Sequence, residues 1–167
     1  MRRALLIGLA GLALTACGKP EPAPAAKAPA AGAKAQWGFA IGKNSVELAW
    51  LDDPTVAESP FRLICARGEG FMVVATAFSP IASEERLSVG AGGDAFALVA
   101  VAGKGPNGPL VRATGPADEP LLNALDSGQP IAASYGAQTF GPVAAPPPAV
   151  RRAFTQSCRK LNGGAEI

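Results

Sequence analysis

Apolar and polar residues alternate with a period of two along much of the chain beyond Trp37, which is the pattern of half-buried β-strands. In the clearest case, Val46, Leu48 and Trp50 alternate with smaller or polar neighbours. The other segments with this pattern are 61–65, 71–78, 86–89, 95–101, 110–113 and 131–135. Short strands separated by glycine-rich turns predict an antiparallel sheet that curls into a sandwich or barrel. The turn at residues 67–70 predicts a hairpin.

Two segments have helical periodicity instead. Residues 119–127 place three leucines on one side, with Asp118 as a candidate N-cap and Gly128 as the stop. Residues 149–161 follow three prolines and carry one apolar stripe, made of Val150, Phe154, Cys158 and Leu161. The predicted fold class is therefore α+β, with two short helices of which the C-terminal one packs on the sheet.

The N-terminal segment has a different composition. Residues 1–16 begin with two arginines and continue as an apolar run, which is too short to span about 30 Å of hydrocarbon and is typical of a signal peptide. The sequence Leu14-Thr15-Ala16-Cys17 resembles the lipobox of bacterial lipoprotein precursors, in which the cysteine is acylated and the chain is cut before it. The resemblance implies lipidation of Cys17 with palmitate-like chains and membrane association through them. Because Gly18 rather than aspartate follows, it also implies the outer membrane, facing the periplasm.

Three regions follow from these patterns: a signal peptide (1–16), a lipidated cysteine with a tether (17–36) and a single folded domain (37–167). The tether consists mainly of proline, alanine and lysine, and proline-rich chains extend by about 3.1 Å per residue. A total of 167 residues suits one domain of this kind.

Once Cys17 is assigned to lipidation, Cys65 and Cys158 remain. Both lie on predicted inward faces, and the periplasm is oxidising, so packing the last helix on the sheet predicts a disulfide between them. Two buried free thiols and a catalytic dithiol are the alternatives, and the chain has no Cys-x-x-Cys motif to favour the second one.

Composition and motifs exclude several kinds of chemistry. The chain contains no histidine, so Ser/His/Asp and Cys/His triads and HExxH zinc sites are excluded. The segment 103–108 fits GxGxxG literally, but a predicted strand follows it rather than a helix, so we interpret it and the run 90–94 as turns. The acidic pairs Asp52-Asp53 and Glu84-Glu85 lack partners at ligand spacing, and we expect neither a metal nor a cofactor.

The charge balance also argues against a nucleic-acid partner. From Trp37 onward, 10 basic residues are balanced by 12 acidic ones. The one basic cluster, formed by Arg151, Arg152, Arg159 and Lys160, is interpreted as a solvated helix face.

A contact loop is the remaining candidate binding element. Residues 135–142 combine Tyr135, Gln138 and Phe140 with glycines, between a strand and a proline-rich connection. The alternative is that Phe140 only fills the core beneath the loop. Ser83, Ser134 and Tyr135 could serve a hydrolase, but the Gly-x-Ser-x-Gly and Ser-x-x-Lys motifs are missing from the sequence.

The residues Leu63-Ile64-Cys65, a leucine-bearing helix before a strand, and the span from Phe154 to Cys158 resemble the pattern of periplasmic accessory proteins associated with type VI secretion. The first motif is one residue shorter here than in that family, and no functional residue is transferred from it.

These observations predict a membrane-anchored envelope lipoprotein with a small non-catalytic binding or structural domain. Its expected partner is an envelope protein or a cell-wall component. The alternatives are an inhibitor of a cell-wall hydrolase and a hydrolase that works without histidine.

Overall fold

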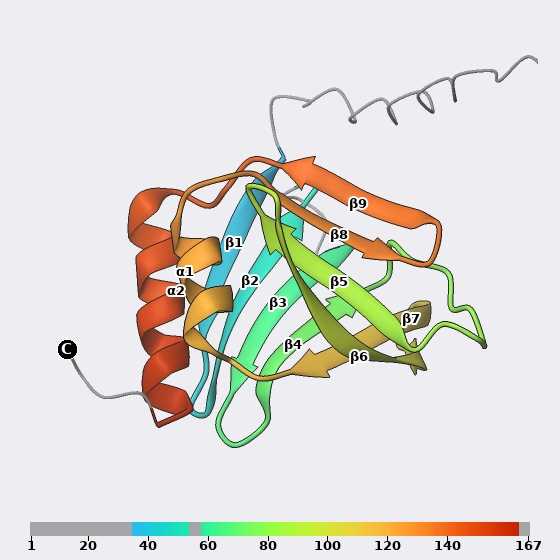
Figure 1. Ribbon diagram of the computed structural model, residues 1–167, viewed down its shortest axis with the longest axis horizontal. Helices are drawn as coiled ribbons and strands as arrows, with labels where there is room; N and C mark the ends of the chain where they lie inside the picture. The colour runs from blue at the N-terminus through green and yellow to red at the C-terminus, as the bar shows by residue number, and fades with distance from the viewer. Residues whose placement is uncertain (1–34, 54–57, 164–167) are drawn as a thin grey trace, which may run out of the picture.

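The computed structural model describes residues 35–53 and 58–163 and contains nine strands and two helices in these ranges (Figure 1). The strands are β1 (Gln36–Ile41), β2 (Ser45–Leu51), β3 (Phe61–Ala66), β4 (Gly70–Ala75), β5 (Arg86–Ala91), β6 (Asp94–Gly105), β7 (Gly108–Gly115), β8 (Ile131–Tyr135) and β9 (Gln138–Val143). The helices are α1 (Glu119–Asp126) and α2 (Pro148–Leu161).

All strands belong to one antiparallel sheet with the order β1-β2-β3-β4-β7-β6-β5-β8-β9. The sheet curls into a half-barrel, and both helices lie at one open side of it (Figure 1). Helix α2 contacts β2 and β3, whereas α1 contacts β5 and α2. The predicted fold class, an α+β domain with the C-terminal helix packed on a curled antiparallel sheet, is confirmed.

The two strands at the edges of the sheet were not predicted. The expected tether includes Gln36, but the structure begins β1 at that residue. The loop expected at 135–142 is the hairpin of β8 and β9. Each missed strand contains a glycine, and β9 also contains Pro142, which breaks the alternating pattern. The strand expected over 71–78 ends at Ala75, after which Thr76 and Ala77 both donate backbone hydrogen bonds to the Pro60 carbonyl.

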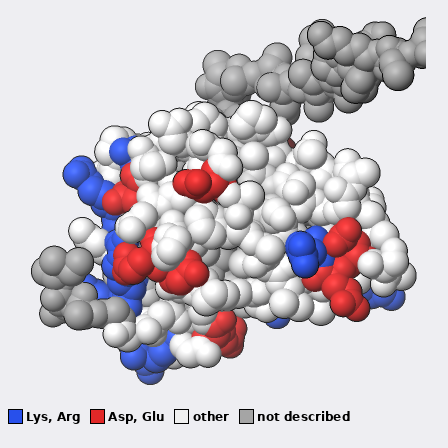
Figure 2. All heavy atoms as spheres, viewed as in Figure 1, with Lys and Arg blue, Asp and Glu red and all other residues white. Residues whose placement is uncertain are grey.

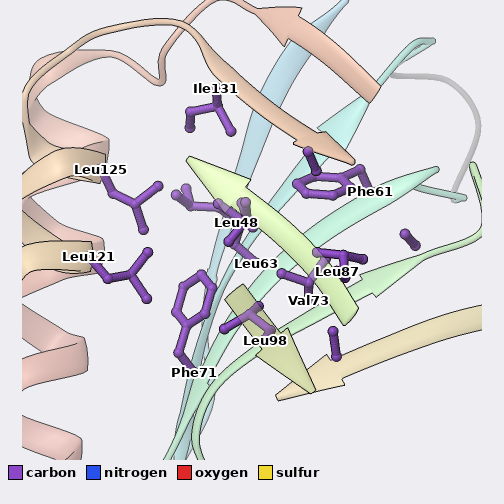
Figure 3. Close-up of a cluster of buried hydrophobic side chains, with 14 of the residues drawn as sticks. Leu48, Phe61, Leu63, Phe71, Val73, Leu87, Leu98, Leu121, Leu125 and Ile131 are labelled. Atoms are coloured by element: carbon purple, nitrogen blue, oxygen red, sulfur yellow. The ribbon is translucent and has the colours of Figure 1, made fainter. Parts of the chain in front are cut away.

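The core forms cross-strand rows on the concave face of the sheet. One row runs from Phe39 through Leu48 and Leu63 to Val73. Leucines of α1 point toward these residues from the helical side (Figure 3). Strand β4 is buried on both faces, as its continuous apolar run from Phe71 to Ala75 indicates.

Local interactions determine how the helices begin and how they are held together. The Asp118 carboxylate accepts a hydrogen bond from the Leu121 amide at 3.1 Å, which confirms the predicted N-cap of α1. Arg151 of α2 donates from Nε to the Asp126 carbonyl at the end of α1, 2.9 Å away. The two helices therefore form one unit against the open side of the half-barrel.

Candidate functional site

Cys65 and Cys158 form a disulfide pair, with Cα atoms 5.3 Å apart and 93 positions apart in sequence. Cys65 lies on the inward face of β3, and Cys158 lies on the buried stripe of α2, together with Phe154. Both cysteines are fully buried. A buried disulfide that joins a strand to the last helix has a structural role, because a reactive thiol needs exposure and a nearby positive charge.

Tyr135, the first residue proposed for the contact loop, is fully buried. Its hydroxyl accepts a hydrogen bond from the Ile81 amide at 3.1 Å, and the Ile81 and Glu84 carbonyl oxygens lie 3.0 and 3.1 Å away as acceptors. The side chain therefore fastens the connection between β4 and β5 from inside, and it offers no surface to a partner.

Gln138 and Phe140 also point toward the protein rather than away from it. The Gln138 amide donates to the Ser79 carbonyl and accepts from the Ser79 amide, both at 2.8 Å. The Phe140 ring stacks on that of Phe61, with centroids 4.3 Å apart. Phe140 thus fills space above the core, as the alternative interpretation of this segment expects.

The other side of the same hairpin lines an open groove of about 600 Å³. Ser134 and Thr139 are cross-strand partners on the face opposite to Tyr135 and Gln138, and both line the groove. The remaining walls include Ser88, Gly90, Ala95 and Ala132. The groove exists because short side chains lie next to each other on strands β5, β6, β8 and β9.

Gly90 lies very close to the backbone of Asp94, the first residue of β6, at the edge of the groove. A Cβ atom at this position would overlap the Asp94 carbonyl oxygen, so any larger residue would displace the turn between β5 and β6. That turn consists of Gly92 and Gly93, both with positive φ, so the predicted turn lies inside the run 90–94, whose other residues belong to β5 and β6. The segment 103–108 is likewise the tight end of the β6–β7 hairpin, with Gly105 opposite Gly108.

The charges in the described part do not converge on the groove. Figure 2 shows a largely white area over the middle of the molecule, between a red patch near the top and a cluster of red and blue side chains at the right. Among the groove residues, Asp94 is the one with a titratable side chain. Of the acidic pairs, Asp52 accepts a hydrogen bond from the Trp50 indole at 2.7 Å, and Glu84 accepts one from the Arg86 amide at 3.0 Å. The groove therefore presents backbone, short side chains and one carboxylate rather than a cluster of titratable groups.

Two arginines of the basic cluster near the C-terminus contact helix α1. Arg151 binds the end of α1, while Arg159 forms an ion pair with Glu119 at the start of α1. Within residues 35–53 and 58–163, no group of three or more cysteine, aspartate or glutamate side chains is placed to hold a metal ion. The lipidation candidate Cys17 lies outside the described residues.

Comparisons with protein-family models, curated proteins and solved structures return no match for this chain. The groove was missed because its residues come from four strands that are dispersed along the sequence. Its signal is the small size of residues at alternate positions on two strands, 88 and 90 on β5 and 132 and 134 on β8.

Proposed function

We propose that this chain is a membrane-anchored envelope lipoprotein whose disulfide-tied half-barrel binds another envelope component without catalysing a reaction. The observation that carries the proposal is the pairing of Cys65 with Cys158 in a chain whose third cysteine, Cys17, ends a lipobox-like segment. In this proposal Cys17 is lipidated at the membrane, and the other two cysteines form a disulfide, which persists in an oxidising compartment outside the cytoplasm.

The anchor in this proposal is a set of acyl chains on Cys17. None of the helices within the described ranges is long and apolar enough to cross a membrane. Several acyl chains on one residue hold a protein to a bilayer firmly, whereas a single chain binds only marginally. The proposal assigns the protein to the outer membrane because Gly18 follows the cysteine.

A binding role is supported by the groove between β5, β8 and β9. It is uncharged except for Asp94 and is lined mainly by short side chains, with Phe140 also among the lining residues, which suits a close contact with an extended or flat partner surface. Inhibition of a cell-wall hydrolase is less well supported. The segment assigned to the inhibitory loop is a hairpin whose Tyr135, Gln138 and Phe140 side chains face the protein.

Photo-crosslinking in intact cells tests the binding role. A photoreactive amino acid in place of Thr139, on the groove, should yield one reproducible adduct with another envelope component. The matched control places the same amino acid at Arg67, an exposed position in the turn between β3 and β4. Equal adducts from both positions, or turnover of a peptidoglycan or ester substrate by the purified protein, would contradict a non-catalytic binding role for the groove.

Lipidation is tested separately. Because serine has no thiol to accept the lipid, Cys17→Ser should abolish incorporation of labelled palmitate and leave the precursor uncut. Equal labelling of the variant and the unaltered chain would refute the assignment of Cys17.

A further inference from the structure

The two edges of the sheet differ in how they are protected against pairing with another strand. Edge strands normally carry charges, prolines or bulges that prevent association with a further strand. Strand β9 follows this rule, because it contains Pro142 and its pairing with β8 shifts between Ile131 and Ala133. Strand β1 has none of these features. Its sequence is QWGFAI, and all six residues pair with β2 in an unbroken register.

The free edge of β1 exposes the backbone groups of alternate residues. The Gly42 amide bonds to the Ser45 carbonyl at 2.8 Å and closes the β1–β2 turn. In an antiparallel pair, closely and widely spaced positions alternate from there, so Ala40 and Gly38 direct their backbone groups toward β2. The amide and carbonyl groups of Trp37, Phe39 and Ile41 consequently point away from the sheet.

The side chains of these same residues lie on the concave face and continue the rows of the core. Trp37, Phe39 and Ile41 stand opposite Trp50, Leu48 and Val46. No strand of the sheet that the structure describes lies beyond β1, since β1 is the first strand. The Trp37 indole donates a hydrogen bond to the Ala144 carbonyl just after β9, at 2.6 Å, so this side chain is held in place at one end of the edge. Ile41 is 70% exposed, the largest exposed fraction among the large hydrophobic residues of the described part.

We infer that β1 pairs with β1 of a second copy of this chain, in antiparallel orientation with Phe39 on the two-fold axis. In this register Phe39 lies opposite the partner's Phe39, and Trp37 lies opposite the partner's Ile41. All three residues direct backbone groups toward the partner, so the ladder of hydrogen bonds is satisfied symmetrically. The pairing forms an aromatic pair on the axis and covers both exposed Ile41 side chains with Trp37, and such cross-strand pairs stabilise sheets.

Charge supports a second copy as the occupant of this edge. A strand with no charged residue opposes no like charges when it meets itself, whereas a charged edge would repel its own copy. A register shifted by one residue would place the apolar side chains of the two copies on opposite faces. A register shifted by two keeps the face but pairs fewer of residues 37, 39 and 41 with one another. If the protein is anchored as proposed above, the shared bilayer raises the local concentration and strengthens the pairing, although the pairing does not depend on the anchor.

Sedimentation of the full chain in density-matched detergent tests the inference. At about 100 µM the unaltered chain should be mainly dimeric, a concentration at which complexes with micromolar Kd form almost fully. Ile41→Lys should raise the Kd for dimerisation at least about tenfold, because it replaces the apolar contact with the partner's Trp37 and puts a charge on the edge strand, which opposes pairing in natural sheets. The matched control is Val101→Lys, which changes an aliphatic side chain that is 55% exposed on β6 and should leave the dimer intact.

Cysteine crosslinking then tests the register. Differently tagged copies carrying Gly38→Cys and Ala40→Cys should form a 38–40 disulfide more efficiently than a 40–40 disulfide, because residues 38 and 40 are direct partners in the proposed ladder. A monomeric unaltered chain, an equal effect of both lysine variants, or crosslinks from position 40 only to a foreign protein would each overturn the inference. The last result would assign the edge to a strand of a different partner.

Discussion

The two halves of the half-barrel are fastened by different chemistry. The half formed by β1 to β4 is joined to α2 by the Cys65–Cys158 disulfide. The half formed by β5 to β9 is closed by hydrogen bonds, in which Tyr135 and Gln138 hold the connection between β4 and β5. The first fastening depends on an oxidising environment and the second does not. A reducing environment should therefore loosen one half selectively, beginning with α2.

Removal of the disulfide should have the largest effect. The chain-entropy model gives about 4 to 5 kcal/mol as the upper limit of stabilisation for a loop closed over 93 positions. The double variant Cys65→Ala/Cys158→Ala should lose much of this free energy of unfolding and release α2 to protease before the sheet. Chemical denaturation and timed proteolysis measure the two effects.

The control for this experiment is the unaltered protein with and without a reductant. Reduction should reproduce the double variant, whereas the variant itself should not respond to the reductant. If cleavage begins in β8 or β9 instead of α2, the two halves are not fastened independently.

Loss of the Tyr135 hydroxyl should have the next largest effect. Tyr135→Phe keeps the buried ring but leaves the Ile81 amide without its acceptor, and an unsatisfied buried polar group costs about 1 to 3 kcal/mol. The free energy of unfolding should fall by that amount, with faster amide exchange over residues 79–85. If the two fastenings act separately, the losses from this variant and from the cysteine variant should add. A markedly smaller combined loss would mean that they stabilise the same unit.

Sequence patterns predicted the elements that have a buried face and failed at the edges of the sheet. Residues 45–51 and 61–66 alternate clearly because each strand buries one face against the core, and α2 shows its stripe for the same reason. The disulfide was predictable because both cysteines lie on such faces. Strands β1 and β9 have one neighbour each, so fewer of their side chains are buried. In β1 the large residues alternate with Gly38 and Ala40 rather than with polar residues, so the apolar–polar pattern that marks a strand is weak.

The side of the β8–β9 hairpin that faces the groove could not be predicted for a related reason. Aromatic residues such as Tyr135 and Phe140 attract attention as binding residues, but they are also the residues that folding buries most readily. Serines, alanines and glycines make up most of the groove lining, and the groove becomes visible only when four strands are placed side by side.

The Gln138 amide should contribute less than the Tyr135 hydroxyl. It makes two hydrogen bonds to the backbone of Ser79 near the surface, where water can replace them. Gln138→Ala should therefore lower the free energy of unfolding by about 1 kcal/mol. Gln138→Glu keeps the acceptor for the Ser79 amide and should recover part of the loss. Denaturation of both variants under identical conditions measures the difference, and an equal loss in both would show that the donor bond alone matters.

The ion pair between Arg159 and Glu119 should have the smallest effect. It links α2 to α1, as does the hydrogen bond from Arg151 to the Asp126 carbonyl. Arg159 donates to both Glu119 oxygens, at 2.9 to 3.1 Å, and also to the Asn123 side chain. The hydrogen bonds from Arg159 lower the pKa of the Glu119 carboxyl below its usual 4.5, more than partial desolvation raises it, and the positive charge of Arg159 lowers it further. Because the pKa is lower in the folded state, the contribution of this pair is present above pH 4.5 and is lost as the pH falls through the folded value.

Glu119→Gln should therefore flatten the pH dependence of stability between neutral pH and pH 3 slightly, with little change in the acid-unfolded limit. Thermal melts across this range, with Glu69→Gln in the exposed β3–β4 turn as the control, measure the difference. An identical pH dependence for the Glu119 variant and the unaltered chain would show that this ion pair adds nothing to stability. The Arg151–Asp126 contact and apolar packing would then hold the helices together.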